Sequence, residues 1–370
     1  MSTPRREPPR HVCIVLLTAI GDVVHALPVA NALKRAWPDT RITWIAEPVP
    51  AGMVSPHPAV DQVIVYEKKK GIEGVRALWS RMRRERFDLT LNLMPYFKSN
   101  WPTLFSRAPE RWTFDRGRAR DGVWLLGNHR LPGRPRAHTQ DMFIEFVQAL
   151  GVDPFPIEWR LVITDEERAL QQALVAQLEG KPGVAVVPTS SMARKDWPAE
   201  RYVPVVDAIH DLGGRAVLVG GPGEREVAAA RVIEAGAARK PVWMMGDVAR
   251  SLIWKIDACS LLVGPDTGPV HIARALEVPV VGLYGHTNPY RVGPWRAYED
   301  LWIDMYTEPG QAPDPSDFTP KHGRMERITS DMVIEKVLLG MNGGRWANRR
   351  RERRDGVGNG GTAGLRGVNG

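Results

Sequence analysis

Short apolar runs alternate with longer amphipathic segments along most of the chain. The apolar runs are rich in Val, Ile and Leu and predict β-strands at residues 11–17, 41–46, 62–65, 88–93, 183–187, 215–220, 241–244, 260–264 and 279–284. The amphipathic segments predict helices at residues 23–36, 73–86, 138–150, 165–178, 200–211, 223–235, 248–257, 268–276 and 330–340. Strands that alternate with helices are typical of parallel sheets covered by helices, which indicates the α/β class.

The alternation restarts after a turn-rich break at Gly180-Lys181-Pro182-Gly183. We therefore expect two Rossmann-like doubly wound domains that face each other across a cleft and bind ligands at the carboxyl ends of their strands. The first is expected at residues 11–165 and the second at 180–328, followed by a C-terminal helix at 329–341. A length of 370 residues suits two domains of ordinary size.

The two ends of the chain lack any apolar pattern. Residues 1–10 contain three Pro and three Arg, and residues 343–370 contain nine Gly and seven Arg. Neither segment can bury enough apolar surface to offset its ordering entropy, so we expect both to be disordered. Over the whole chain, a hydrophobic content of 43% and a charged content of 25% are those of a folded globular protein.

The positive charge is local. The formal net charge is +8, but the two ends carry most of it, and residues 343–370 set seven Arg against two acidic residues. Elsewhere the basic residues concentrate in the segment 67–86, which holds eight basic and three acidic side chains. Because no basic stripe extends over the whole chain, we expect no nucleic-acid partner.

The first apolar run is too short to span a membrane, because it ends by Ile20. Three Arg precede it, as in a signal peptide, but a first β-strand fits the run equally well and is favoured. The two cysteines, Cys13 and Cys259, have no spacing that suggests a disulfide framework and are expected as small buried side chains in a reducing compartment. We therefore expect a cytoplasmic protein.

A carboxylate follows the first predicted strand. The segment 17–28 passes from a strand through Gly21 into a helix and places Asp22 near the helix start. Such a side chain either points towards a ligand at the end of the strand or interacts with the first turn of its own helix. The pattern alone leaves both interpretations open.

A polar loop follows the strand at 183–187. Three hydroxyl residues, Thr189, Ser190 and Ser191, precede two cations, Arg194 and Lys195. Hydroxyl groups, backbone amides and a Lys can hold phosphate oxygens and neutralise the charge of a leaving diphosphate. The alternative is a structural polar loop that anchors the next helix.

The segment 264–271 follows another strand and begins a helix near Gly268. Asp266 or Thr267 is expected to cap this helix, and its free backbone amides would form an anion site. His271 is either a ligand contact or a hydrogen-bonded histidine of the core.

The glycine-rich segment 220–226 lacks the third glycine of a dinucleotide-binding fingerprint, because Glu226 stands near that position. The chain also has no P-loop motif and no Cys/His cluster with metal-ligand spacing. We therefore expect no cofactor and no metal site. Glu224 or Glu226 could accept hydrogen bonds from a ribose.

Taken together, these segments over residues 11–341 resemble glycosyltransferase family 9, the ADP-heptose:lipopolysaccharide heptosyltransferases. The resemblance is carried by Ile20-Gly21-Asp22 with Leu27-Pro28, Phe87-Asp88-Leu89 leading to Lys98-Ser99, Lys195-Asp196-Trp197-Pro198, Gly220-Gly221-Pro222, Asp266-Thr267-Gly268-Pro269 with His271, and residues 282–289 running to Gly293-Pro294. It implies a GT-B fold of two Rossmann-like domains and a metal-independent, inverting transfer. The nucleotide-sugar donor, expected to be ADP-heptose, would bind mainly to the C-terminal domain.

The resemblance also implies roles for individual residues. Asp22 falls on the proposed general base, Lys195 on the cation beside the donor phosphates, and Lys98 on the acceptor side. The residues that fall on the donor site are Thr189, Ser190, Ser191, Asp266, Thr267, Gly268 and His271, and Glu224 is expected there as a contact to the ribose. Many members carry a cysteine pair before the last helix, where this chain has none, and His286 replaces a small residue or Pro. These departures concern the donor sugar and the acceptor more than the fold.

The acceptor implied by the resemblance is a phosphorylated glycolipid at the inner face of the bacterial cytoplasmic membrane. The basic segment 67–86, with Trp79 and Phe87 among its cations, would suit a peripheral contact with that surface, or it is a solvated helix face. The Arg-rich tail is a second candidate for such a contact. Two other functions stay open: a nucleotide-sugar 2-epimerase of the same architecture, and a nucleotide-sugar-binding protein that has lost catalysis.

Overall fold

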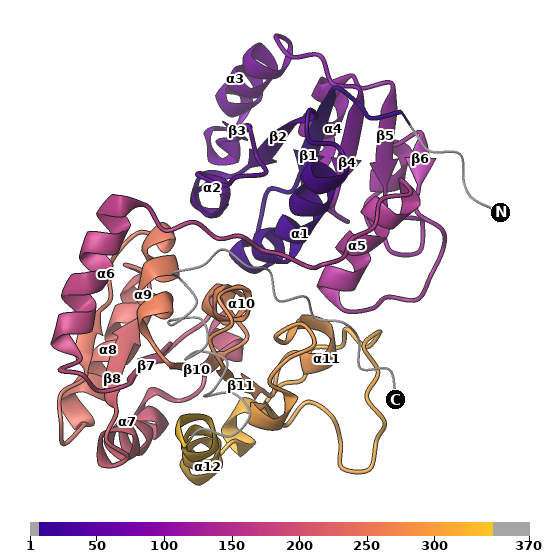
Figure 1. Cartoon of the computed structure of the whole chain (residues 1–370). Coiled ribbons are helices and arrows are strands. Elements are labelled where there is room, and N and C mark those ends of the chain that lie inside the picture. The colour runs from indigo at the N-terminus through magenta and orange to yellow at the C-terminus, as the bar shows by residue number, and fades with distance from the viewer. Residues whose placement is uncertain (1–6, 343–370) are drawn as a thin grey trace. The chain divides into compact units, whose positions relative to one another are not determined.

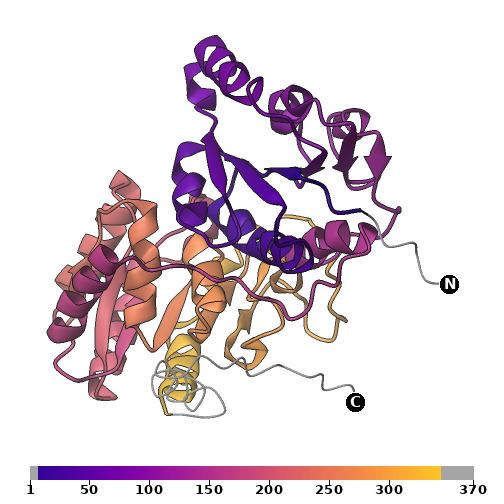
Figure 2. The ribbon, with the colours of Figure 1, turned by 45° about the horizontal axis from the view of Figure 1, so that its top comes forward.

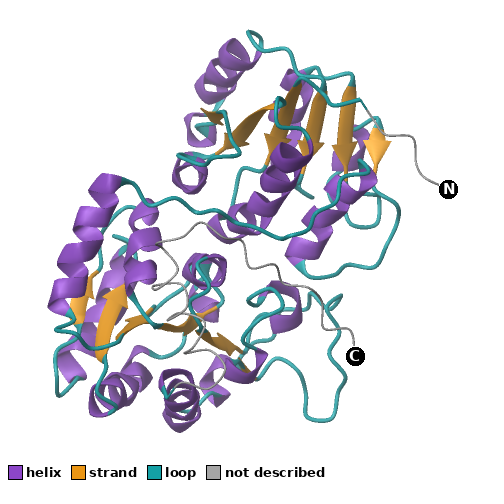
Figure 3. Ribbon diagram, in the orientation of Figure 1, coloured by secondary structure: helices purple, strands orange, loops and turns teal. Residues whose placement is uncertain are grey.

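The computed structural model describes residues 7–342, which form two compact units (Figure 1). The first unit ends at Val162 and the second begins at Ile163. Each is an α/β unit with one parallel sheet of six strands (Figure 3). The predicted fold class of two doubly wound units is confirmed.

The first sheet has the strand order β3-β2-β1-β4-β5-β6, and all its neighbouring strands pair in parallel. Its strands are β1 (His11–Val15), β2 (Arg41–Ala46), β3 (Gln62–Val65), β4 (Leu89–Asn92), β5 (Glu110–Thr113) and β6 (His129–Arg130). Its helices are α1 (Ile20–Ala36), α2 (Pro48–Val54), α3 (Ile72–Met82), α4 (Asn100–Ser106) and α5 (Thr139–Ala149). Helix α1 packs against α2 and α5 on one face of the sheet, and α3 packs against α4 on the other (Figure 2).

The second sheet repeats this arrangement with the order β12-β11-β10-β7-β8-β9, again all parallel. Its strands are β7 (Gly183–Val186), β8 (Arg215–Val219), β9 (Val242–Met244), β10 (Leu261–Pro265), β11 (Val280–Tyr284) and β12 (Ile303–Asp304). Its helices are α6 (Asp165–Gln177), α7 (Tyr202–Asp211), α8 (Glu224–Gly236), α9 (Leu252–Ala258), α10 (Gly268–Ala275), α11 (Pro289–Val292) and α12 (Ser330–Met341).

Burial explains why the central strands read as continuous apolar runs. Every residue of β1, β7, β10 and β11 is buried, as expected for parallel strands that are covered by helices on both faces. Cys13 lies in β1 and Cys259 just before β10, and both are buried free thiols, as predicted. Burial raises the pKa of the Cys13 thiol.

The strand order reverses direction once in each sheet. In the first sheet this switch lies between β1 and β4, and in the second between β7 and β10. Loops from two neighbouring strands diverge at such a point, which opens a crevice for ligands at the carboxyl ends of the strands. The architecture therefore places one candidate binding site in each unit.

All nine predicted strands and all nine predicted helices are present, with ends that differ by at most five residues. Three short strands, β5, β6 and β12, and three short helices, α2, α4 and α11, were missed. Helix α6 belongs to the second unit, where its Gln171 donates to the backbone O of Trp254 and to Asp257. The helix expected at 329–341 is α12, which packs against α7 in the same unit. Of the predicted disordered ends, residues 1–6 and 343–370 lie outside the described residues, whereas residues 7–10 are described and Pro9 O accepts a hydrogen bond from the Thr40 hydroxyl at 2.6 Å.

The expectation for Phe87 was wrong. Its ring is buried and packs 4.4 Å from the His11 ring, so it belongs to the core and not to a basic surface. Trp79, by contrast, is exposed as expected. The position of an aromatic residue among cations in the sequence does not show whether its side chain faces the core or the solvent.

Candidate active site

The switch point of the first sheet brings two loops together. The loop after β1 runs through Leu17 and Thr18 to the start of α1, and the loop after β4 runs from Leu93 to Ser99. The two are tied by the Leu93 amide, which donates to Val15 O at 3.1 Å, and by the Leu17 amide, which donates to the Met94 sulfur at 3.3 Å. Side chains on these loops therefore share one end of the sheet.

Asp22 occupies the first turn of α1 and is partly exposed. Its Oδ2 accepts a hydrogen bond from the Ala19 amide at 3.1 Å. A carboxylate at this position is also stabilised by the positive end of the helix dipole. The contact with the helix start is therefore real, and the partial exposure leaves the carboxylate accessible at the carboxyl end of β1.

Lys98 reaches back from the β4 loop to the β1 loop. Its ammonium group donates a hydrogen bond to the Thr18 hydroxyl. Burial lowers the Lys98 pKa, with the nearby Lys68 adding to that effect, while the charges of Glu47 and Asp22 oppose it. The ammonium thus lies within the electrostatic reach of two carboxylates, and one of them is Asp22.

Hydrogen bonds within the loop that carries Lys98 hold its conformation. Asn92 Nδ2 donates to Ser99 Oγ at 3.0 Å, and that hydroxyl donates to Tyr96 O at 3.0 Å. These bonds fix the turn on which Lys98 stands. Thr18 and Glu47 were missed as members of this cluster, although Glu47 directly follows β2, which is a signal that could have revealed it.

In the second unit, the partly buried Lys195 forms a polar cluster with the buried Asp266 and His271 at the β7/β10 switch point. Lys195 Nζ donates to Asp266 Oδ2 at 2.7 Å, and His271 Nε2 lies 3.7 Å from Asp266 Oδ1. Burial works against ionisation of Asp266, but Lys195 and His271 outweigh it and hold the pKa of this carboxyl well below its usual range. The structure brings together three residues that the sequence placed in two separate motifs.

The loop after β7 that carries Ser190 and Ser191, called the serine loop here, is held partly by hydrogen bonds within it. The Ser190 amide and hydroxyl both donate to Asp196 Oδ1, at 2.7 and 3.0 Å. Arg225 forms an ion pair with Asp196 and donates to Ser190 O at 2.6 Å. Ser190 therefore shapes the loop, whereas Ser191 is exposed. Trp197 anchors the loop by donating from Nε1 to Ile328 O at 3.0 Å.

Two buried hydroxyl groups at this end of the second sheet have no hydrogen-bond partner among residues 7–342. They are Thr189 Oγ1, after β7, and the Tyr284 hydroxyl, at the end of β11. Burial raises the Tyr284 pKa, and the charges of Asp266 and Asp304 reinforce that rise. Buried polar groups are normally hydrogen-bonded, so these two hydroxyls are candidates for a ligand contact, although the Tyr284 ring folds back over Gly282.

Helix α10 begins at Gly268, as predicted. Thr267 is its N-cap by position, but its side chain makes no capping hydrogen bond, and Asp266 is engaged with Lys195. The expected side-chain cap is therefore wrong. In the first turn the Val270 amide donates to Thr267 O at 3.0 Å and Pro269 lacks an amide hydrogen, which leaves the Gly268 amide for an anion.

In the glycine-rich segment after β8, a glutamate side chain lies close against the backbone of the glycines. The Glu226 carboxylate folds back so far that a Cβ on Gly221 would lie 2.8 Å from its Oε2. Glu224, the first residue of α8, is exposed. Glu224 thus lies at the same end of the sheet as Thr189 but outside the buried cluster. Arg225, which links α8 to the serine loop, was missed because its partners are far away in the sequence.

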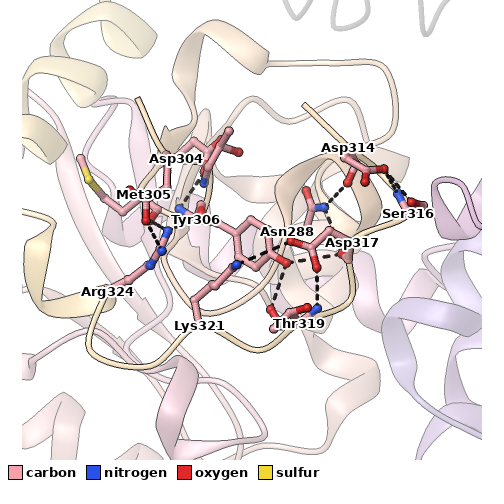
Figure 4. Close-up of polar contacts among 12 residues, drawn as sticks. Asn288, Asp304, Met305, Tyr306, Asp314, Ser316, Asp317, Thr319, Lys321 and Arg324 are labelled. Carbon is pink, nitrogen blue, oxygen red and sulfur yellow. Dashed lines mark hydrogen bonds and ion pairs between the residues drawn. The ribbon is translucent and has the colours of Figure 1, made fainter. Parts of the chain in front are cut away.

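A long segment between β12 and α12 contacts the residues that follow β11. Figure 4 shows its polar contacts, including those with Asn288. His286 Nδ1 pairs with Lys321 O at 2.8 Å, and the Lys321 amide donates to His286 O at 3.2 Å. Asn288 Nδ2 donates to Asp314 O at 2.7 Å, and the Tyr306 hydroxyl donates to Thr319 O at 2.9 Å. Hydrogen bonds therefore hold the segment that lacks the cysteine pair.

Gly285 marks the place where this segment touches the sheet most closely. A Cβ at that position would lie 2.6 Å from the backbone of Arg324 and Met325. His286 follows directly and is buried, with its pKa lowered by burial and by the charges of Arg194, His322 and Lys195. The covering segment thus brings His322 towards the cations of the serine loop.

Residues 7–342 contain no group of three or more His, Cys, Asp or Glu side chains placed to hold one metal ion. No helix within that range combines the length and apolar character that a bilayer span requires.

Comparison with known proteins shows which family the chain belongs to. Residues 75–309 match glycosyltransferase family 9 (heptosyltransferase). The chain is 31% identical to the lipopolysaccharide core heptosyltransferase OpsX of Haemophilus influenzae, over 90% of this chain and 96% of that protein. It resembles the crystal structure of a family 9 glycosyl transferase from Veillonella parvula, with a TM-score of 0.76 and 23% identity over 90% of this chain and 98% of the other.

The fold also resembles that of the Escherichia coli heptosyltransferase WaaC, solved with ADP, with a TM-score of 0.70 and 20% identity over 89% of this chain and 99% of that one. The family match covers more than half of the chain, and the OpsX similarity extends over nearly all of it. The chain therefore belongs to glycosyltransferase family 9, the heptosyltransferase family.

Proposed function

We propose that this protein transfers a heptose from ADP-heptose to a lipopolysaccharide core acceptor, with inversion at the anomeric carbon. The observation that carries the proposal is the similarity to OpsX over nearly the whole chain, combined with candidate residues at the switch point of each sheet. OpsX is itself named a lipopolysaccharide core heptosyltransferase.

The donor is assigned to the second unit. Its diphosphate would lie against the first turn of α10, where the Gly268 amide and the positive end of the helix dipole attract an anion. Lys195 would exchange part of its contact with Asp266 for a phosphate oxygen, and Thr189 and Tyr284 would donate their unpaired hydroxyl groups. These positive and polar groups supply the charge stabilisation that a departing ADP needs, so we propose a reaction that requires no metal.

The acceptor is assigned to the first unit. Asp22 would accept the proton of the attacking sugar hydroxyl as a general base. The hydroxyl oxygen forms a bond to the anomeric carbon as the bond from that carbon to the diphosphate breaks, and ADP leaves with the electron pair. Lys98, beside Asp22, would hold an anionic group of the acceptor.

A glycolipid acceptor requires access to a membrane. We propose a peripheral contact with the anionic inner face of the cytoplasmic membrane, supported by the exposed cations of the segment 67–86.

The two alternative functions predict different reactions. A 2-epimerase converts its nucleotide sugar without an acceptor, and a binding protein without catalysis releases no ADP. A panel of nucleotide sugars should first be screened by thermal shift, and the best ligand then assayed for ADP release with and without a defined core acceptor. We expect ADP-heptose to stabilise the protein and ADP release to require the acceptor. Turnover without an acceptor would instead favour the epimerase.

A further inference from the structure

Helix α4 turns an apolar side towards solvent. Phe97 precedes the helix in a 3₁₀ turn, and Trp101 and Leu104 follow it at intervals of four and three residues. This spacing places the three side chains on one side of the helical segment. They are 52%, 41% and 46% exposed, while the smaller Pro102 and Thr103 are buried. An amphipathic helix normally directs its large apolar residues inwards, so α4 is reversed relative to that expectation.

The apolar side of α4 continues onto α3. The Trp79 ring packs 5.1 Å from the Phe105 ring, which lies 5.4 Å from the Trp101 ring. Trp79 is itself exposed. We call Trp79, Phe97, Trp101, Leu104 and Phe105 the α3–α4 aromatic surface. Contiguous exposed apolar side chains of this kind mark a site of interaction.

Cations surround this surface. The Arg107 guanidinium lies 5.4 Å from the centre of the Trp79 ring and donates to Arg83 O at 3.2 Å. Residues 67–107 contain ten basic and four acidic side chains. The 3₁₀ turn Lys68–Lys70, which precedes α3, is exposed throughout. Tryptophan and basic side chains together are typical of segments that lie in the headgroup region of an anionic bilayer.

We propose that the α3–α4 aromatic surface binds the anionic lipid bilayer that contains the acceptor, an assignment that rests on the proposed transfer to a glycolipid. Phe97 and Lys98 are neighbours in one short turn, and Lys98 reaches Thr18 at the candidate acceptor site. Insertion of Phe97 among lipids would therefore place the headgroup of a membrane-bound acceptor next to Lys98 and Asp22.

The charge around the surface favours a bilayer over a second copy of the chain. Two copies that met through this surface would bring their cations together, which costs free energy, whereas anionic headgroups would neutralise them. The apolar side chains explain why lipid rather than a soluble polyanion is the better partner, because they gain free energy only by leaving water.

The test uses the full chain and vesicles of phosphatidylcholine with or without phosphatidylglycerol. The variant replaces Phe97, Trp101 and Leu104 by Ser, and the matched control replaces Leu170, Val175 and Val232, which are exposed apolar residues of the second unit, by Ser. We expect the wild type and the control to sediment with anionic vesicles at low salt, and the variant to partition at least about tenfold less. Binding should weaken as salt is added.

Turnover separates this proposal from the proposed function. The variant should retain wild-type ADP release with a water-soluble, deacylated acceptor and lose it with an acceptor embedded in vesicles. Equal partitioning of wild type and variant would overturn the surface, as would a wild-type dimer that the variant dissociates without any vesicle binding. If the wild type binds anionic vesicles through this surface but transfers no heptose to either acceptor, the proposed function fails and the lipid-binding surface stands.

Discussion

The ammonium group of Lys195 and the carboxylate of Asp266 are joined by a 2.7 Å hydrogen bond between residues 71 positions apart. Lys195 comes from the loop after β7 and Asp266 from the loop after β10, the two strands between which the second sheet changes direction. Asp266 is buried and Lys195 is partly buried, so the carboxylate depends on the ammonium group in place of water. Any anion that binds Lys195 must therefore compete with Asp266.

Lys195→Ala should weaken ADP binding by about tenfold to a hundredfold, because a hydrogen bond to a charged group contributes roughly 1.5–3 kcal/mol. Transfer should slow as well. Titration calorimetry with ADP measures the first effect. Arg194→Ala, at the exposed neighbour, is the matched control and should bind ADP like the wild type. The reverse result for the two variants would show that the phosphate-binding cation is Arg194.

The ion pair between Asp266 and Lys195 should also make the free energy of unfolding depend on pH. Its folded-state pKa is depressed, so the unfolded state binds the proton more readily. The stabilisation from this carboxylate is thus complete above its unfolded pKa, near about 4, and is lost as pH falls from there through the folded pKa. The difference in the free energy of unfolding between wild type and Asp266→Asn should be largest near neutral pH and shrink below about pH 4.

Urea unfolding at a series of pH values measures this difference, with Glu200→Gln, at an exposed carboxylate, as the control. The control should show little change in stability at any pH. A difference between wild type and Asp266→Asn that stays constant from neutral pH to pH 3 would contradict the pairing.

Asp22→Asn should lower turnover by about 10² to 10⁴-fold, the range typical of a lost general base. The amide oxygen can still accept from the Ala19 amide, so the melting temperature should change little. ADP affinity should be unchanged, because the donor is assigned to the second unit. Steady-state kinetics with Asp39→Asn, an exposed residue, provide the comparison. Wild-type turnover in Asp22→Asn would leave this carboxylate with only its role at the helix start.

Lys98→Met should raise the KM for the acceptor by roughly tenfold, because an acceptor anion would lose its charged partner. The dissociation constant of ADP should not change. Lys69→Met removes a nearby exposed charge and should leave both values as they are in the wild type. An altered ADP affinity with an unchanged acceptor KM would move Lys98 from the acceptor side to the donor side.

Much of the fold follows from local patterns in the sequence. The buried central strands and the long amphipathic helices carry a strong periodic signal, so their positions were predicted. The missed elements lack that signal. Strands β6 and β12 have two residues each and exist only through pairing with their neighbours, while α2 and α4 contain Pro50 and Pro102, which usually argue against a helix.

The candidate site was predicted only as separate pieces. The motifs around Asp22, Lys195 and Asp266 each stood out, but the ion pair between Lys195 and Asp266 depends on strand order, which the sequence does not state. The same holds for Thr18, which joins Lys98 across 80 residues. The missing side-chain cap of α10 is a further case. Asp266, one of the two expected capping residues, pairs with Lys195 from a distant loop and does not cap its own helix.

The central claim is transfer of a heptose to a core acceptor, and analysis of the reaction products tests it most directly. Purified protein, ADP-heptose and a defined deacylated core acceptor are incubated, and the products are analysed by mass spectrometry, by ADP quantification and by NMR of the new linkage. We predict one added heptose per ADP released, with the anomeric configuration inverted relative to the donor. An unmodified acceptor alongside consumed ADP-heptose, or no consumption of the donor by folded protein that binds ADP, would contradict this function.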